Sequence, residues 1–182
     1  MKRALAFILL AGAASADTSG PAWWTVHDDF ATLRSCWVVK SGAWTIENGA
    51  LVGRRGDSPD ACGMIEYKTA LKNPTELELD AQLMEPIGGN AGLQVQFAGQ
   101  KFFHYVSGSG IWPPYVHSPT GLKKDGVVHI RLRRLKGKYE FWVDGKLILN
   151  RTVETAQEQP SGELKIWSAY GAVVKFDNLK AR

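Results

Sequence analysis

The sequence predicts an all-β protein made of two packed antiparallel sheets, a β-sandwich. About a dozen short segments alternate apolar and polar residues with the two-residue period of a half-buried strand. Turn signals separate these segments at near-regular intervals. No segment has the period of an amphipathic helix. Short strands that each hide one face need a second sheet to pack against, so two layers are expected.

The clearest strands lie between residues 127 and 150. In residues 128–133 apolar and polar side chains alternate, as in a strand with one buried face. A turn at residues 135–138 leads into a second alternating segment, 139–143. Asp144-Gly145 then predicts a type I′ hairpin, because both central positions of that turn need a positive φ. We therefore expect three consecutive antiparallel strands here.

The rest of the chain repeats this pattern. Asn48-Gly49 is a second type I′ signal. Residues 76–84 alternate most regularly, with Leu77 and Leu79 on the apolar face. Residues 107–124 are the longest stretch with no strand pattern, and residues 152–162 form a polar connector. The other expected strands are 23–30, 36–40, 43–47, 50–53, 63–68, 76–84, 91–97, 101–106, 163–167 and 173–179.

Residues 1–16 have the features of a secretory signal peptide. Lys2 and Arg3 form a basic start, an apolar run follows, and Ala14-Ser15-Ala16 is an A-x-A cleavage site. The apolar run is too short for a membrane span, although a retained anchor is the alternative. No later segment is long and apolar enough to cross a membrane. We expect a secreted or periplasmic protein whose residues 17–182 form one domain.

The charge balance is not that of a nucleic-acid-binding protein. The formal net charge is +4, which includes Lys2 and Arg3, whereas a nucleic-acid-binding surface needs a strongly basic stripe. The cluster of Arg131, Arg133 and Arg134 is expected to be a solvated strand face, with an anion or ligand contact from Arg131 as the alternative. We expect a monomer with no nucleic-acid partner.

Cys36 and Cys62 are expected to form a disulfide, because the count is even and a secreted protein meets an oxidising compartment. Two reduced, buried thiols are the alternative. No His–Cys spacing resembles a zinc site. Asp28 or Asp29 could meet Asp177 near the chain ends, but calcium needs more oxygen ligands than these residues supply. We therefore expect no metal and no cofactor.

A further pattern is carried by six segments: Asp29-Phe30, Trp37, residues 42–51, residues 90–93, residues 127–148 and residues 174–179. Together they resemble the 3-keto-disaccharide hydrolase domains of the concanavalin A-like lectin/glucanase superfamily. The resemblance covers nearly the whole chain after residue 16. It implies a concanavalin A-like jelly roll and an activity on glycosides.

A glycoside hydrolase needs two carboxyl groups that flank the scissile bond. Glu78 and Asp80 lie two residues apart on one face of the expected strand 76–84, a spacing that does not exclude such a pair. His104, beside Tyr105, is a third candidate catalytic group. The alternative is that the two acids form the wet face of a half-exposed strand and that His104 is structural.

A saccharide-binding surface needs flat rings for stacking and amides or carboxylates for the sugar hydroxyls. Gln94 and Gln96 are expected to face outward, with Asp80 on a neighbouring strand. Trp142 and Trp167 are also expected to face outward, while the tryptophans near the start of the chain lie in the core. The candidate binding residues are Gln94, Gln96, His104, Trp112, Tyr115, His117 and Arg131.

Three functions remain open at this stage. The favoured one is a carbohydrate-binding domain with a saccharide as its partner. The second is a glycoside-acting hydrolase that uses Glu78, Asp80 and His104. The third is a structural envelope protein with no small ligand, whose surface would lack a groove lined by aromatic rings.

Overall fold

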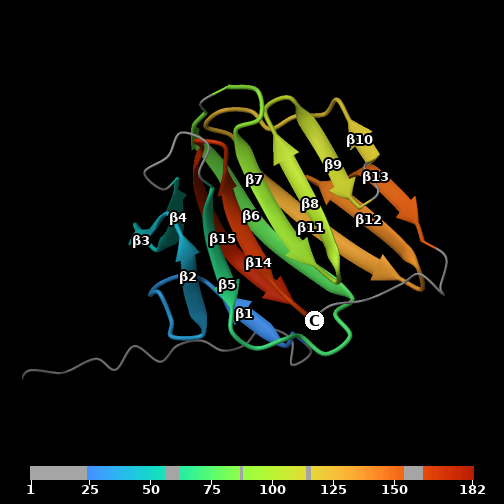
Figure 1. The fold of residues 1–182 in the computed structure, drawn as a ribbon, viewed down its shortest axis with the longest axis horizontal. Helices are drawn as coiled ribbons and strands as arrows, with labels where there is room; N and C mark the ends of the chain where they lie inside the picture. The colour runs from blue at the N-terminus through green and yellow to red at the C-terminus, as the bar shows by residue number, and fades with distance from the viewer. Residues whose placement is uncertain (1–23, 56–61, 87, 114–115, 154–161) are drawn as a thin grey trace, which may run out of the picture.

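The computed structural model describes residues 24–55, 62–86, 88–113, 116–153 and 162–182. Within these residues the chain forms strands and turns, with no helix, and the strands lie in two stacked layers (Figure 1). The strands are β1 Val26–Asp28, β2 Trp37–Ser41, β3 Ala43–Glu47, β4 Ala50–Arg54, β5 Gly63–Tyr67, β6 Glu76–Glu85, β7 Gly92–Phe97, β8 Gln100–Tyr105, β9 Gly108–Trp112, β10 Val116–Ser118, β11 Val127–Leu135, β12 Lys138–Val143, β13 Lys146–Thr152, β14 Lys165–Ala169 and β15 Val173–Ala181.

Each layer is an antiparallel sheet. One sheet has the order β13-β12-β11-β6-β15-β4-β3, with β1 paired to β15, and the other has the order β10-β9-β8-β7-β14-β5-β2. Successive strands such as β6 and β7 lie in opposite sheets, so the chain crosses repeatedly between the layers. In the described part of the chain the sheets contain eight and seven strands. The expected two-sheet antiparallel β-sandwich is confirmed.

The two hairpins expected from Asn48-Gly49 and Asp144-Gly145 are confirmed. The φ values are 52° and 72° in the first turn and 50° and 73° in the second. Ala98-Gly99 and Lys136-Gly137 also have positive φ at both positions. Neither of these begins with Asn or Asp, which adopt positive φ most easily, so they are weaker signals in the sequence. The turns fix the register of the strand pairs that they join.

The core lies between the two sheets and is built from one face of each. In β6, Leu77 and Leu79 are fully buried, and in β7, Leu93, Val95 and Phe97 point inward. This alternation is the one expected from the sequence. Removal of this apolar surface from water is the main force that holds the sheets together.

Glu76 lies on the polar outer face of β6 but is buried. This residue is only 3% exposed. Arg131 on β11 and Arg182, which follows β15, both donate hydrogen bonds to its carboxylate, with 2.9 Å between Arg182 Nε and Glu76 Oε2. Burial acts to raise the pKa of Glu76, but the hydrogen bonds from Arg182 and Arg131 outweigh burial and lower the pKa. This ion cluster connects three neighbouring strands.

We predict that Glu76→Gln lowers the free energy of unfolding by on the order of 2 kcal/mol at neutral pH, because two guanidinium groups lose a charged acceptor. Since the folded pKa is lowered, this contribution is present above the pKa of the unfolded chain and is lost as the pH falls through the folded pKa. Urea unfolding at neutral pH and at about pH 3 measures both effects. Glu85→Gln, at the exposed end of the same strand, is the control. An equal loss at both pH values would contradict the prediction.

The segment 107–124, expected to be irregular, contains the two strands β9 and β10, so that prediction is wrong. The reason is that Gly108-Ser109-Gly110 has a low intrinsic preference for strands. In the structure the pairing of β9 with β8 and β10 overrides this preference.

Cys36 and Cys62 are separate thiols, and the predicted disulfide is wrong. Cys36 immediately precedes β2 and Cys62 immediately precedes β5. These strands are antiparallel, with Trp37 opposite Tyr67 and Ser41 opposite Met64. The two cysteines therefore flank opposite ends of the ladder, about 15 Å apart at the rise of a strand. A disulfide needs Cα atoms within about 7 Å.

Residues 1–16, where a signal peptide is expected, lie outside the described residues, as do residues 154–161 of the expected connector. Across the ranges that the structure describes, no helix has the length and apolarity to cross a lipid bilayer.

Candidate functional site

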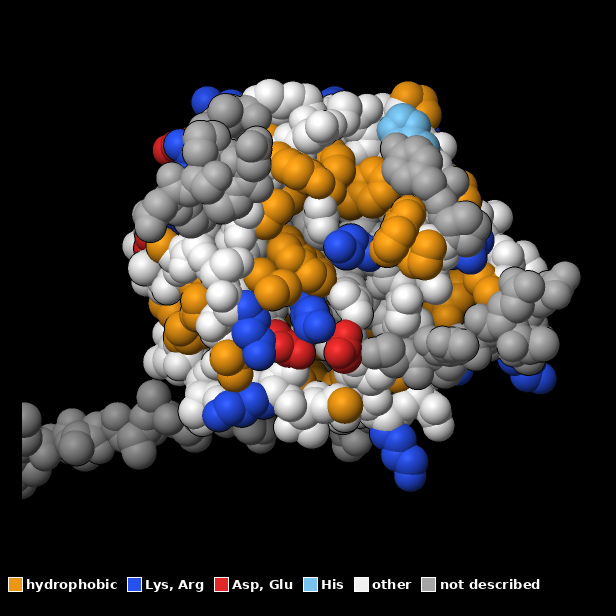
Figure 2. Space-filling model, in the orientation of Figure 1, with side chains coloured by type: hydrophobic (Ala, Val, Ile, Leu, Met, Phe, Trp, Pro, Cys, Tyr) orange, Lys and Arg blue, Asp and Glu red, His pale blue; other side chains and the backbone are white. Residues whose placement is uncertain are grey.

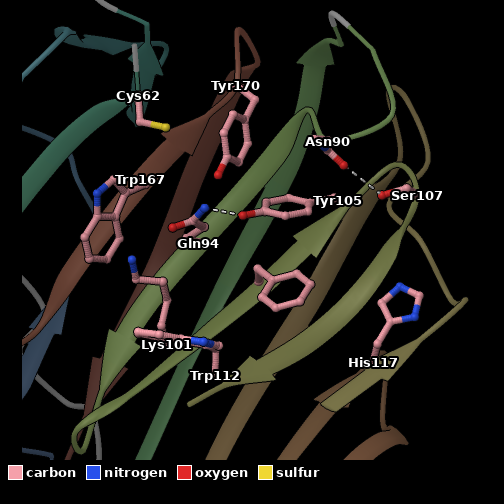
Figure 3. Close-up of a pocket in the computed structure, with 11 residues that line it drawn as sticks. Cys62, Asn90, Gln94, Lys101, Tyr105, Ser107, Trp112, His117, Trp167 and Tyr170 are labelled. Carbon is pink, nitrogen blue, oxygen red and sulfur yellow. Dashed lines mark hydrogen bonds between the residues drawn. The ribbon is translucent and has the colours of Figure 1, made fainter. Parts of the chain in front are cut away.

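The outer face of the seven-stranded sheet carries an open cavity of about 490 Å³. Figure 2 shows a hollow on this side of the molecule, surrounded by hydrophobic side chains with basic side chains among them. Figure 3 shows how its walls project from several strands and loops. The described residues that line it are Cys62, Asn90, Gln94, Lys101, Phe103, Tyr105, Ser107, Trp112, His117, Trp167 and Tyr170.

One row of residues crosses the sheet at right angles to the strands and forms the floor of the cavity. Trp167 on β14 lies opposite Gln94 on β7, which in turn lies opposite Phe103 on β8. Phe103 lies opposite Gly110 on β9, and Gly110 lies opposite His117 on β10. Members of such a row project from the same face of a sheet. The floor therefore consists of three rings, with the Gln94 amide between the first two and a gap without a side chain at Gly110 between the last two.

The gap in this row explains why the face is hollow. A Cβ atom at Gly110 would overlap the ring of Phe103, and a Cβ atom at Gly108 would overlap the ring of His117. The glycines that weaken the strand signal of β9 thus make room for the two rings. Substitution of either glycine would push a ring out of place and change the floor of the cavity.

Tyr105 and Gln94 form the polar centre of the floor (Figure 3). Gln94 is 6% exposed, and its Nε2 donates a hydrogen bond to the Tyr105 hydroxyl. The Tyr105 ring stacks on Phe103 with centroids 4.8 Å apart and meets Tyr170 edge-on at 5.7 Å. Burial raises the pKa of Tyr105. The phenol therefore stays neutral and fixes the orientation of the Gln94 amide.

Lys101 is the cation of the cavity. Its Nζ lies 5.0 Å from the centre of the Trp167 ring, a cation–π contact. Trp112, which is 50% exposed, is its cross-strand partner on β9. Among the described lining residues there is no Asp or Glu. The described lining thus offers ring faces, amides, hydroxyls and the positive charge of Lys101.

Three of the predicted binding residues meet in this cavity. Gln94, Trp112 and His117 all line it. Gln96 lies on the same face of β7, but its Nε2 donates a hydrogen bond to Glu163 Oε2 at 2.7 Å. Tyr115 lies outside the described residues.

Asp80, Glu78 and Arg131 lie in the other sheet. The expectation that Asp80 sits on a strand next to Gln94 is wrong, because β6 pairs with β11 and β15. The Asp80 carboxylate is 2.8 Å from His129 Nδ1, and Glu78 is 3.5 Å from Arg131 Nε. Strand alternation predicts which face a residue is on, but not which sheet the strand joins.

His104 faces the core and not the cavity. It pairs with the inward-facing Leu93 and is 1% exposed. Ser109 Oγ donates a hydrogen bond to the Thr120 carbonyl, so His104 Nδ1 is the donor in its 2.5 Å contact with Ser109 Oγ. Burial lowers the pKa of His104 from 6.5 to about 4. In the folded protein this histidine is a neutral core residue.

We predict that His104 makes the protein sensitive to mild acid. The unfolded chain binds a proton at His104 below about pH 6.5 and the folded chain only below about pH 4, so stability falls between these values by on the order of 3 kcal/mol. His104→Asn should remove most of this loss in urea unfolding followed from pH 7 to about pH 4.5. His117→Asn, at an exposed histidine, should keep it. Unchanged acid sensitivity in His104→Asn would show that the prediction is wrong.

Lys101, Phe103 and Tyr105 belong to the cavity but are missing from the predicted site. Consecutive apolar residues at Phe102 and Phe103 hide the alternation of β8. A usable signal existed in the Ala98-Gly99 turn, because a two-residue hairpin places Gln94 opposite Phe103 and therefore on the same face.

The aspartates considered for calcium have other partners. Asp28 accepts hydrogen bonds from Trp37 Nε1 at 2.8 Å and from the Phe30 amide at 2.9 Å. Asp29 accepts one from the Ala31 amide. Asp177 Oδ1 accepts a hydrogen bond from the Asn178 amide at 2.8 Å. Within the described ranges no group of His, Cys, Asp and Glu side chains is arranged to hold a metal ion.

No protein-family model matches the chain, and no curated protein matches its sequence. Solved structures do share its fold. The carbohydrate-binding module CBM66 from Bacillus subtilis is similar with a TM-score of 0.64 at 13% identity, over 81% of this chain and 95% of that one. The carbohydrate recognition domain of Emp46p has a TM-score of 0.65 at 11% identity, over 87% and 97% of the two chains.

A third similar structure is a Bacillus subtilis protein of unknown function with a galectin-like fold, with a TM-score of 0.70 at 10% identity over 87% of this chain and 95% of that one. At such identities the similarity shows the fold alone, which is a two-sheet antiparallel β-sandwich of the jelly-roll type. The narrower resemblance to 3-keto-disaccharide hydrolase domains stays a prediction.

Proposed function

We propose that this protein binds a carbohydrate in the cavity on the outer face of the seven-stranded sheet. The observation that carries the proposal is the floor row, in which the Gln94 amide lies between the Trp167 and Phe103 rings. Sugars have apolar faces that pack on aromatic rings and hydroxyl groups that bond to amides.

The remaining groups of the cavity suit the same ligand class. The Nε2 of Gln94 is used by Tyr105, which leaves the carbonyl oxygen to accept a bond from a sugar hydroxyl. Trp112 presents a half-exposed ring at the rim. Two of the similar structures are a carbohydrate-binding module and a carbohydrate recognition domain, which supports the proposal. A secreted or periplasmic location, expected from residues 1–16, fits an extracellular glycan.

The same cavity favours binding over glycoside hydrolysis. Hydrolysis in most glycosidases needs two carboxyl groups at the scissile bond. The described lining of the cavity contains neither Asp nor Glu. Glu78 and Asp80 belong to a strand of the opposite sheet. The proposal therefore assigns them no catalytic role, and it needs no metal and no cofactor.

We predict that Trp112→Ala and Gln94→Ala each weaken saccharide binding by roughly tenfold, because one removes a stacking ring and the other removes the central amide. A glycan array identifies the ligand, and isothermal titration calorimetry measures the affinities. Trp142→Ala, on the outer face of the eight-stranded sheet, is the matched control and should bind normally.

Two results would overturn this proposal. The absence of binding to every saccharide tested would leave the structural envelope role. Turnover of the bound oligosaccharide would instead identify a hydrolase, and activity that survives in Glu78→Ala, Asp80→Ala and His104→Ala would place its catalytic groups elsewhere.

A further inference from the structure

We infer that the saccharide bound in this cavity is acidic and carries a carboxylate or sulfate group that pairs with Lys101. This inference rests on the proposed function and specifies its ligand class. It depends on how charge is distributed over the outer face of the seven-stranded sheet, where among the described residues Glu66 and Glu163 are paired with lysines and Lys101 has no carboxylate partner.

The positive charge of Lys101 has no carboxylate partner among the described residues. Its Nζ lies 5.0 Å from the centre of the Trp167 ring. An aromatic ring attracts a cation but carries no net charge, so the contact positions the ammonium group without neutralising it. Lys101 Nζ therefore remains available to an anionic ligand.

Two described acids on this face interact with other lysines. Glu66 lies 2.9 Å from Lys40 Nζ and 3.7 Å from Lys165 Nζ. Glu163 lies 3.0 Å from Lys165 Nζ and also accepts the hydrogen bond from Gln96. Lys165 on β14, Gln96 on β7 and Lys101 on β8 lie opposite one another in one row across the sheet. That row thus contains one lysine that is held by acids and one that faces the cavity.

Lys101 lies where the charged edge of an acidic sugar would be if the sugar ring stacked on Trp112. Lys101 and Trp112 are directly opposite each other on β8 and β9, and cross-strand partners on one face lie within reach of the same ligand. A uronic acid or a sulfated sugar has its charge at the edge of the ring. With the ring stacked on Trp112, that edge can meet Lys101 while hydroxyl groups face Gln94 (Figure 3).

The test uses two pairs of probes that differ in charge and share a backbone. One pair is trigalacturonate and its methyl ester, and the other is κ-carrageenan tetrasaccharide and the same tetrasaccharide with its sulfate groups removed. Calorimetry on the whole protein at low salt should show at least one charged member binding roughly tenfold tighter than its neutral partner. The pair that responds tells whether the charge is a carboxylate or a sulfate. Added salt should reduce the preference, since the cavity is open to solvent.

Lys101→Gln should abolish the preference and bring the charged probe to the affinity of its neutral partner. Lys146→Gln removes the same charge at an exposed position of β13 in the other sheet and should leave the preference intact. Equal or tighter binding of the neutral members, or a preference that survives Lys101→Gln, would overturn the inference and leave the proposed function standing. If no saccharide of either kind binds, the proposed function itself is wrong.

Discussion

The strict alternation of side chains between the two faces of a β-strand is the constraint on which the rest of this structure depends. Once Leu93 and Val95 of β7 enter the core, Gln94 must face outward. Hydrogen bonding between neighbouring strands then aligns Trp167, Phe103 and the remaining floor row with Gln94. A one-residue shift of β7 would bury the amide and expose the apolar residues, so the energy of the core also fixes the geometry of the cavity.

Glycine has a special place in this arrangement. Gly110 and Gly108 weaken β9 as an isolated strand, yet they leave room for the Phe103 and His117 rings. The strand is held by its neighbours β8 and β10 and not by its own propensity. The two glycines that make β9 hard to predict from the sequence are therefore the residues that leave space for the cavity on the outer face of the sheet.

The sequence was enough to predict the sandwich, most strands and the phase of β7, because these depend on local alternation and on turn residues such as Asn48-Gly49 and Asp144-Gly145. It was not enough to predict which sheet a strand joins. The expected neighbours Asp80 and Gln94 in fact lie in different sheets. The same limit explains Cys36 and Cys62, whose even count says nothing about the direction in which β2 and β5 run. The inward direction of His104 is also hidden in the sequence, because Phe102 and Phe103 obscure the alternation of β8.

The two outer faces of the sandwich use charge in different ways. On the eight-stranded sheet the buried Glu76 is held by Arg131 and Arg182, and this cluster stabilises the packing of strands. On the seven-stranded sheet Lys101 lies against a ring and opens to the cavity. A charge that is already neutralised adds stability, whereas a charge without a carboxylate partner is available for recognition.

The most direct test of this account is a titration followed by the indole ¹H–¹⁵N signals of the tryptophans. Trp112 and Trp167 line the cavity, while Trp142 lies in the eight-stranded sheet. The account predicts that a bound oligosaccharide shifts the signals of Trp112 and Trp167 and leaves that of Trp142 in place. Movement of the Trp142 signal with those of Trp112 and Trp167 unchanged would contradict it.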